Sequence, residues 1–149
     1  MVCENNIKIL HFLPRWDNGG MEHAALDIIT HFERVYTYEI CAAFLESEFA
    51  VDELKKIGIK FTSLYQNREY NFKDCVRGLH TYLKENKYDI IHIHSGSISV
   101  LAEVSMVAHK HHINKIIVHS HCAAESKTLK YRIIKFISLP ILNHCPTDY

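Results

Sequence analysis

Two short motifs hold four histidines at alternating positions, His92 and His94 in Ile-Ile-His-Ile-His-Ser, and His119 and His121 in Ile-Val-His-Ser-His-Cys. Alternation along a strand directs both members of a pair to one face of a sheet. Consecutive strands of an α/β fold are commonly neighbours, so we expect the four imidazoles to converge at one end of the sheet. Such a group suits zinc binding, or a single histidine at its mouth can take part in hydrogen bonding or acid/base chemistry.

We expect the second of these chemistries and no metal or other cofactor. Neither motif contains a carboxylate, and histidine is common throughout the chain. The other eight are His11, His23, His31, His80, His109, His111, His112 and His144. Cys122 directly follows the second pair, but no partner is evident that would orient it as a nucleophile, and we interpret it as a packing residue.

The second candidate site is the segment 15–22, in which Gly19 and Gly20 immediately precede an expected helix. Glycines there would let an anion such as a diphosphate approach the free N–H groups of the helix N-terminus. A tight strand-to-helix turn explains the same two glycines equally well. The segment is neither G-x-G-x-x-G nor a Walker loop, which disfavours a dinucleotide dehydrogenase and a P-loop ATPase.

Strands and helices are expected to alternate along the whole chain. Apolar runs predict strands at 7–13, 38–45, 59–64, 89–94 and 115–121. Amphipathic spacing predicts helices at about 21–32, 47–56, 72–83, 98–111 and 127–138, and 140–149 is typical of a further strand. This alternation predicts a single α/β domain with a doubly wound parallel sheet. Ligands of such folds bind at the carboxyl ends of the strands, where the sequence places Gly19, Gly20, His94, Ser95, Gly96, His121 and Cys122.

Composition narrows the classes of function. The 149 residues carry a formal net charge of zero, which disfavours nucleic acid as a partner. The odd number of scattered cysteines predicts a reducing cytosol, and the N-terminus lacks the pattern of an export signal. We therefore expect a cytoplasmic protein.

One expected helix combines basic and apolar residues, and two interpretations stay open for it. Its basic residues are Lys127, Lys130, Arg132 and Lys135, and its apolar residues are Leu129, Ile133, Phe136 and Ile137. The helix either rests on an anionic membrane surface or covers the sheet with its basic face in solvent.

The ordered motifs resemble family 4 glycosyltransferases, bacterial enzymes that extend capsular and exopolysaccharide repeat units. The segment 8–13 followed by Gly19-Gly20-Met21-Glu22 is similar to the family's opening strand and its Gly-Gly-x-Glu entry into the first helix. The segments 88–94 and 117–121 resemble two later strands of the family, and 145–149 resembles the start of its Cys-Ser-Asp-like segment. Cys122 departs from the pattern, because related sequences often carry Asn or another polar residue there.

The resemblance implies the N-terminal, acceptor-side domain of a GT-B type enzyme with two facing Rossmann-like domains. It implies retaining, metal-independent transfer from a nucleotide sugar to a saccharide acceptor, often lipid-linked. By the same resemblance His121 is the catalytic residue that contacts the transferred sugar. The implied substrate-binding residues are Gly19, Gly20, Glu22, His94, Ser95, Gly96 and His119.

The chain stops at Tyr149 without the Glu-containing donor-binding motif of such enzymes, so we expect a fragment that is inactive by itself. Two other hypotheses stay open. One is a non-catalytic acceptor-binding or membrane-docking subunit whose donor domain is a separate chain. The other is a metal-dependent hydrolase built on the two histidine pairs. Apolar surface left open for the second domain is also expected to favour self-association.

Overall fold

The computed structural model describes residues 7–32, 36–65, 71–121, 128–145 and 147–148. All strands run parallel in one six-stranded sheet of order β3-β2-β1-β4-β5-β6. The strands are β1 (Lys8–Leu13), β2 (Thr37–Phe44), β3 (Lys60–Tyr65), β4 (Ile90–Ser95), β5 (Lys115–Ser120) and β6 (Thr147–Asp148). The helices are α1 (Gly20–Phe32), α2 (Val51–Lys56), α3 (Phe72–Glu85), α4 (Ile98–Lys110) and α5 (Leu129–His144). The Rossmann-like α/β fold predicted from the sequence is confirmed.

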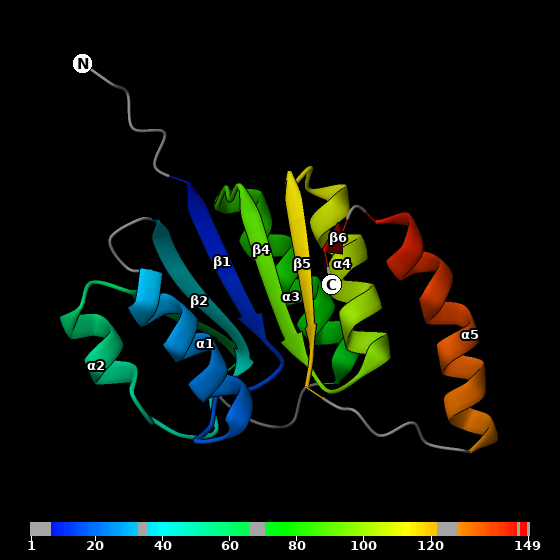
Figure 1. The fold of residues 1–149 in the computed structure, drawn as a ribbon, viewed down its shortest axis with the longest axis horizontal. Coiled ribbons are helices and arrows are strands. Elements are labelled where there is room, and N and C mark those ends of the chain that lie inside the picture. Colours follow the sequence, from blue (N-terminus) through cyan, green and yellow to red (C-terminus); the bar gives the residue numbers. More distant parts are fainter. Residues whose placement is uncertain (1–6, 33–35, 66–70, 122–127, 146, 149) are drawn as a thin grey trace.

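The helices form a layer on each side of the sheet. In Figure 1, α1 and α2 lie in front of the sheet and α3 and α4 lie behind it. The chain order β3-β2-β1-β4-β5 requires a crossover from one edge to the middle after β3, which moves the later helices to the opposite face. The carboxyl ends of β1, β4 and β5 therefore meet at one edge, and α1 begins at that same edge (Figure 1).

Two apolar cores result, one on each face. The larger core packs alternate residues of β1, β4 and β5 against α3 and α4, including Leu10, Phe12, Ile91, Ile93 and Ile116. The smaller core packs β1 and β2 against α1 and α2, around the fully buried Trp16. At roughly 25 cal/mol per Å² of buried apolar surface, these layers supply the main driving force for folding.

Local sequence sets the start of α3 but not the start of α2. The Asn71 side chain accepts a hydrogen bond from the Asp74 N–H, and the Asp74 carboxylate accepts one from the Asn71 N–H, which makes a capping box. The helix predicted from Ser47 begins only at Val51, because Ala50 adopts a left-handed conformation with φ 55° that a helix does not continue through.

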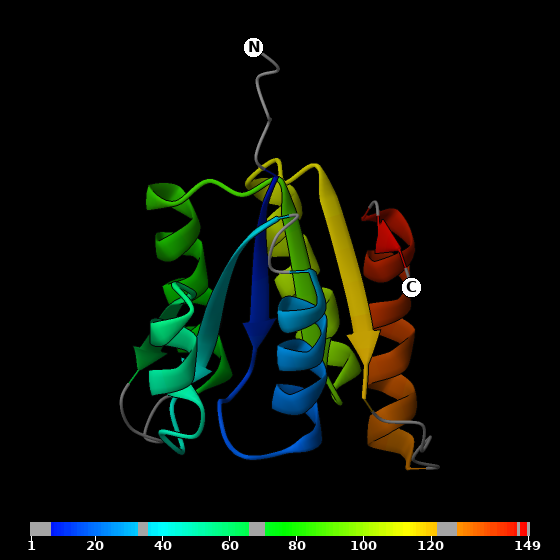
Figure 2. The same cartoon turned by 60° about the vertical axis from the view of Figure 1, so that its left-hand side comes forward.

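The prediction of a strand beginning near Pro140 is wrong. Helix α5 continues through Pro140 to His144, and β6 contains only Thr147 and Asp148. Proline removes one helical hydrogen bond, but Ser138 and Leu142 on either side of it are buried, and α5 packs on α4. Tertiary packing therefore outweighs the local cost. Helix α5 lies at the outer edge of the domain, beyond α4 (Figures 1 and 2).

Candidate functional site

Five histidines share one face of β1, β4 and β5, and we call them the histidine cluster: His11, His92, His94, His119 and His121. His11 pairs in register with His92, and His94 pairs with His119. The centroids of contacting rings lie between 4.1 and 5.7 Å apart. The predicted convergence of the four histidines in the two motifs is therefore present, and a fifth joins them from β1.

Three members form a hydrogen-bonded chain from the interior to the edge of the sheet. His11 Nδ1 lies 3.0 Å from His94 Nε2, and His94 Nδ1 lies 3.2 Å from His121 Nε2. A neutral imidazole carries one N–H, so the protons of the chain must all point in the same direction along it. Either direction leaves His11 Nε2 buried without a hydrogen-bond partner among the described residues.

Burial favours the neutral form of four members of the cluster, His11, His92, His94 and His121. Burial, and then the neighbouring His92, lowers the pKa of His11 to about 3. Burial, and then His119 and His121, lowers the pKa of His92 to about 4. The pKa of His94 lies far below its ordinary value for the same reasons, and that of His121 is lowered by burial and by His119. At neutral pH these imidazoles therefore present lone pairs and N–H groups rather than charges.

Three of the five histidines are partly exposed to solvent. His11 and His94 are buried, whereas His92, His119 and His121 are half-buried. Helix α1 covers the β1 side of this face, and within the described part of the chain no helix lies in front of β5 (Figure 1). The members of the cluster that a ligand can contact are therefore the half-buried ones.

The glycine turn lies at the same edge of the sheet as the outer histidines. A Cβ atom on Gly19 would lie 2.8 Å from Glu22 Oε2, whereas a Cβ on Gly20 would meet nothing within 4 Å. Glu22 is buried, and its Oε1 accepts a hydrogen bond of 3.3 Å from the Asp17 N–H. Gly19 thus makes room for the carboxylate that holds the loop, and Gly20 has no steric reason to lack a side chain.

The loop after β4 completes the edge. Ser95 is buried, and its Oγ accepts a hydrogen bond from the Ser97 N–H at 3.0 Å. The Ser95 carbonyl accepts a hydrogen bond of 3.1 Å from the His121 N–H, which fixes the end of β5 beside that of β4. Gly96 is exposed at the edge. Cys122 lies outside the described residues.

Sequence reasoning missed His11 as a site residue. The sequence does place it two residues from Ile9 and Leu13 on an otherwise apolar strand, where a polar side chain is unexpected. To place His11 beside the motif histidines, one must also know that β1 and β4 are adjacent strands. This adjacency follows from the 3-2-1-4-5 strand order of Rossmann-like sheets.

A second buried polar group lies toward the amino ends of the strands, and we call it the Glu39 network: Lys8, Glu39, Lys60, Tyr82 and Tyr88. The Glu39 carboxylate lies 2.7 Å from Lys8 Nζ and 3.4 Å from Lys60 Nζ, and it accepts hydrogen bonds from both tyrosine hydroxyls. Burial alone would raise the pKa of Glu39, but the hydrogen bonds and lysine charges outweigh it and hold the pKa below its usual value.

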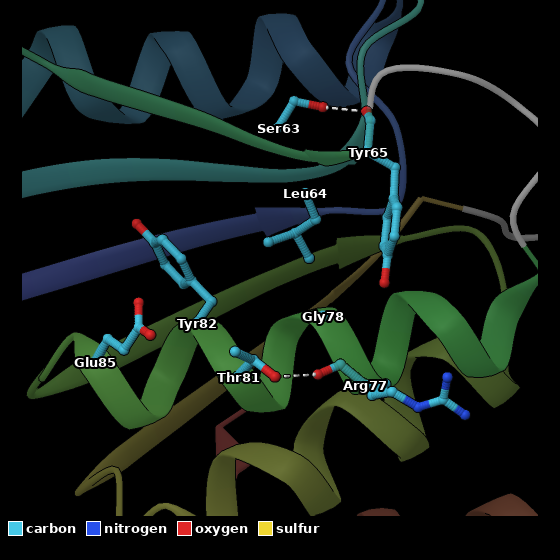
Figure 3. Close-up of a pocket in the computed structure, with 8 residues that line it drawn as sticks. All are labelled: Ser63, Leu64, Tyr65, Arg77, Gly78, Thr81, Tyr82 and Glu85. Atoms are coloured by element: carbon cyan, nitrogen blue, oxygen red, sulfur yellow. Dashed lines mark hydrogen bonds between the residues drawn. The ribbon is translucent and has the colours of Figure 1, made fainter.

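An open hollow lies between β3 and α3, far from the histidine cluster (Figure 3). Its polar groups bond largely within the protein: Ser63 Oγ donates to the Tyr65 carbonyl, and Thr81 Oγ1 donates to the Arg77 carbonyl. Gly78 is needed there, because a Cβ would lie 2.9 Å from the Tyr65 hydroxyl. The hollow is a weaker candidate site than the carboxyl edge, because few of its polar groups are left for a ligand.

Helix α5 does not cover the sheet with its apolar residues. Leu129 and Phe136 are 72% and 80% exposed, and Ile133 and Ile137 are exposed as well. The interpretation of an apolar face packed on the sheet is therefore wrong, because α5 packs on α4 through its opposite side. Lys130 and Arg132 are exposed, Lys135 is half-buried, and Lys127 lies outside the described residues.

Comparison with solved structures assigns the chain to a class of fold. A glycosyltransferase from Rickettsia africae superposes with a TM-score of 0.63 at 19% identity, over 88% of this chain and 34% of that one. The Anabaena protein HepE, solved in complex with UDP and glucose, superposes with a TM-score of 0.59 at 15% identity, over 94% of this chain and 36% of that one. The chain therefore has the Rossmann-like fold found in part of these proteins.

Sequence comparison points to the same group. The chain is 25% identical over 129 residues to the capsular polysaccharide biosynthesis glycosyltransferase CapH of Staphylococcus aureus. The match covers 87% of this chain and 35% of CapH. No family model matches the chain. The protein is thus similar to a capsule-related glycosyltransferase, and it spans about a third of the length of that relative.

Proposed function

We propose that the chain is the N-terminal, acceptor-side domain of a retaining glycosyltransferase of surface polysaccharide synthesis. It would help to move a sugar from a nucleotide-sugar donor to a lipid-linked saccharide acceptor, without a metal ion in the transfer step. The observation that carries the proposal is the meeting of the α1 N-terminus and the histidine cluster at one carboxyl edge, in a chain similar to a capsular glycosyltransferase.

The edge offers distinct groups for the parts of a nucleotide sugar. The open space at Gly20 lets the donor diphosphate or the transferred sugar approach the α1 N-terminus. In this proposal His121 is the catalytic residue. It is half-buried at the outer end of the histidine cluster, and its lowered pKa favours the neutral imidazole. His94, Ser95, Gly96 and His119 would shape the acceptor side, while the buried Glu22 acts by holding the loop around Gly19.

The test is transfer activity in the presence of a donor-binding domain, on the same chain or supplied separately. His121→Ala should lower the transfer rate at least about 100-fold, the usual scale for losing an acid/base or electrostatic contact at a reacting centre. His109→Ala is the matched control, because His109 is exposed on α4 outside the cluster and should leave the rate unchanged. Equal rates for both variants would contradict the role of His121.

The exposed face of α5 supports peripheral contact with an anionic membrane. Leu129, Ile133 and Phe136 lie on one helical face, and the exposed Lys130 and Arg132 flank it on either side. No helix among the described residues is long and apolar enough to span a bilayer. The exposed face of α5 supports contact at the membrane surface, where the acceptor lipid would lie.

Vesicle flotation tests this contact. The chain should float with vesicles that contain phosphatidylglycerol and not with neutral vesicles, and the double change Ile133→Ser and Phe136→Ser should abolish flotation. Phe32→Ser is the control, because Phe32 is also an exposed apolar residue but lies at the end of α1. Flotation that survives the α5 changes would contradict docking through this helix.

A further inference from the structure

We propose that His94, His119 and His121 form a binding site for one zinc ion at the carboxyl edge of β4 and β5. Each of these residues offers a ring nitrogen, and the three nitrogens lie within 4.8 Å of one another. The inference rests only on the arrangement of the three imidazoles and not on the proposed glycosyl transfer. An ion held by His121 would exclude the sugar contact proposed for that residue, so zinc and sugar are alternative occupants of this edge.

The spacing suits a tetrahedral ion. Two nitrogens that are each 2.0–2.1 Å from a tetrahedral zinc lie about 3.3 Å apart. His94 Nδ1 and His121 Nε2 are already 3.2 Å apart. His119 lies two residues before His121 and pairs in register with His94, and its ring nitrogen is within 4.8 Å of those of the other two.

The surroundings of His94 also match those of a metal ligand. A zinc-bound histidine usually donates its second N–H to a neighbouring acceptor, which fixes the tautomer. With Nδ1 on the ion, His94 Nε2 carries the proton, and His11 Nδ1 lies 3.0 Å away to accept it. His11 would thus be a positioning residue behind the site rather than a ligand.

A second set of nitrogens, from His11, His92 and His94, also lies within 4.8 Å. The two sets share His94, whose Nε2 faces His11 and whose Nδ1 faces His121. We assign the ion to His94, His119 and His121 because two of these three residues, His119 and His121, are only half-buried, whereas the other set contains the buried His11 as well as His94. Three protein nitrogens leave one position of a tetrahedral ion for water or another ligand.

Isothermal titration calorimetry with zinc chloride tests the site, on the 149-residue chain without an affinity tag at pH 7.5. We expect one zinc ion per chain with a dissociation constant below about 10 µM. His119→Ala should weaken binding at least about 10-fold, and His11→Leu should weaken it by a smaller factor, as expected for a partner behind a ligand. His119 is half-buried, so this variant is expected to fold even if changes at His94 do not.

Two control variants locate the ion. His80 and His111 form the other hydrogen-bonded histidine pair of the described residues, with Nδ1 and Nε2 2.8 Å apart, and His80→Ala should leave zinc affinity unchanged. His92→Ala should weaken zinc binding less than His119→Ala does, because His92 contacts the rings of His94 and His119 but is not a ligand in the proposed set. The proposal is overturned if zinc fails to bind, if His119→Ala binds as wild type, or if His92→Ala loses binding while His119→Ala keeps it. Zinc alone is the probe, so none of these results bears on whether the protein transfers sugar.

Discussion

The Glu39 network and the histidine cluster are two polar groups buried toward opposite ends of the same sheet. Glu39 has two lysine ammonium groups and two tyrosine hydroxyls as partners. The histidine cluster contains no charged partner, and His11 Nε2 has no hydrogen-bond partner among the described residues. The protein thus supplies hydrogen-bond and charge partners for the Glu39 carboxylate, but within the described part of the chain it leaves one ring nitrogen of the histidine cluster without a partner.

This difference separates a structural role from a binding role. A buried polar group with all its partners contributes to stability, whereas an unpartnered one costs about 1–3 kcal/mol. Aliphatic side chains occupy the opposite face of the same three strands, including Leu10, Ile91 and Ile116. Five imidazoles on the face toward α1 therefore stabilise the fold less than aliphatic side chains would. We infer that they are present because they bind a ligand.

The largest expected effect is the response of stability to pH. The folded chain holds the pKa of His11 and His94 far below 6.5, so the unfolded chain takes up protons first as the pH falls. Stability is therefore complete above about pH 6.5 and decreases below it, by about 2 kcal/mol for each histidine between pH 7 and pH 5. Urea denaturation at several pH values measures this loss.

The Glu39 network sharpens the pH test, because it also loses stability as the pH falls but does so over a lower pH range than the histidines. The pKa of Glu39 is held below its ordinary value of 4.5, so its contribution is present above that pH and is lost only as the pH falls further. Between pH 7 and pH 5 Glu39 contributes little, so the loss over this range comes mainly from the buried histidines. A free energy of unfolding that stays constant over this range would contradict the neutral, buried state of the cluster.

Removal of Glu39 is the next largest effect. Glu39→Ala leaves two lysines and two buried tyrosine hydroxyls without their acceptor, and it should lower the free energy of unfolding by about 3 kcal/mol. Asp52→Ala removes an acidic residue whose pairing with Lys55 is exposed, and it should cost less than about 0.5 kcal/mol. Urea denaturation of both variants compares them, and similar costs would show that the network is not structural.

Unlike the removal of Glu39, replacement of the buried histidines should cost little stability. The double change His11→Leu and His94→Leu keeps the volume of the buried side chains and removes the unpartnered nitrogen. At pH 7.5 the free energy of unfolding should stay within about 1 kcal/mol of wild type, and the decrease between pH 7 and pH 5 should become much smaller. A loss above about 3 kcal/mol would mean that the cluster stabilises the fold.

The two glycines of the first loop give the smallest effects on stability. Gly19→Ala places a Cβ against the Glu22 carboxylate and should cost about 1 kcal/mol. Gly20→Ala meets open space and should change stability by less than about 0.5 kcal/mol. Thermal unfolding compares the pair. If Gly20→Ala is the more destabilising of the two, the turn has a geometry other than the one described.

Most of the fold and the four motif histidines could be predicted from sequence. Buried strands read as continuous apolar runs, and alternation of strand and helix determines a parallel sheet. Glu39 could not be predicted, because its partners come from β1, β3, α3 and the segment before β4, which are brought together only by the topology. The orientation of α5 depends likewise on its packing against α4, which the pattern of residues in the helix alone does not contain.

The most direct test of the account is the sugar-transfer rate of the His11→Leu and His94→Leu variant, measured with a donor-binding domain present. The account predicts a protein that unfolds at wild-type denaturant concentration and transfers sugar at least about 100-fold more slowly, because His121 loses the partner that orients it. A variant that is equally stable and transfers sugar at the wild-type rate would contradict the claim that the histidine cluster is kept for binding and catalysis.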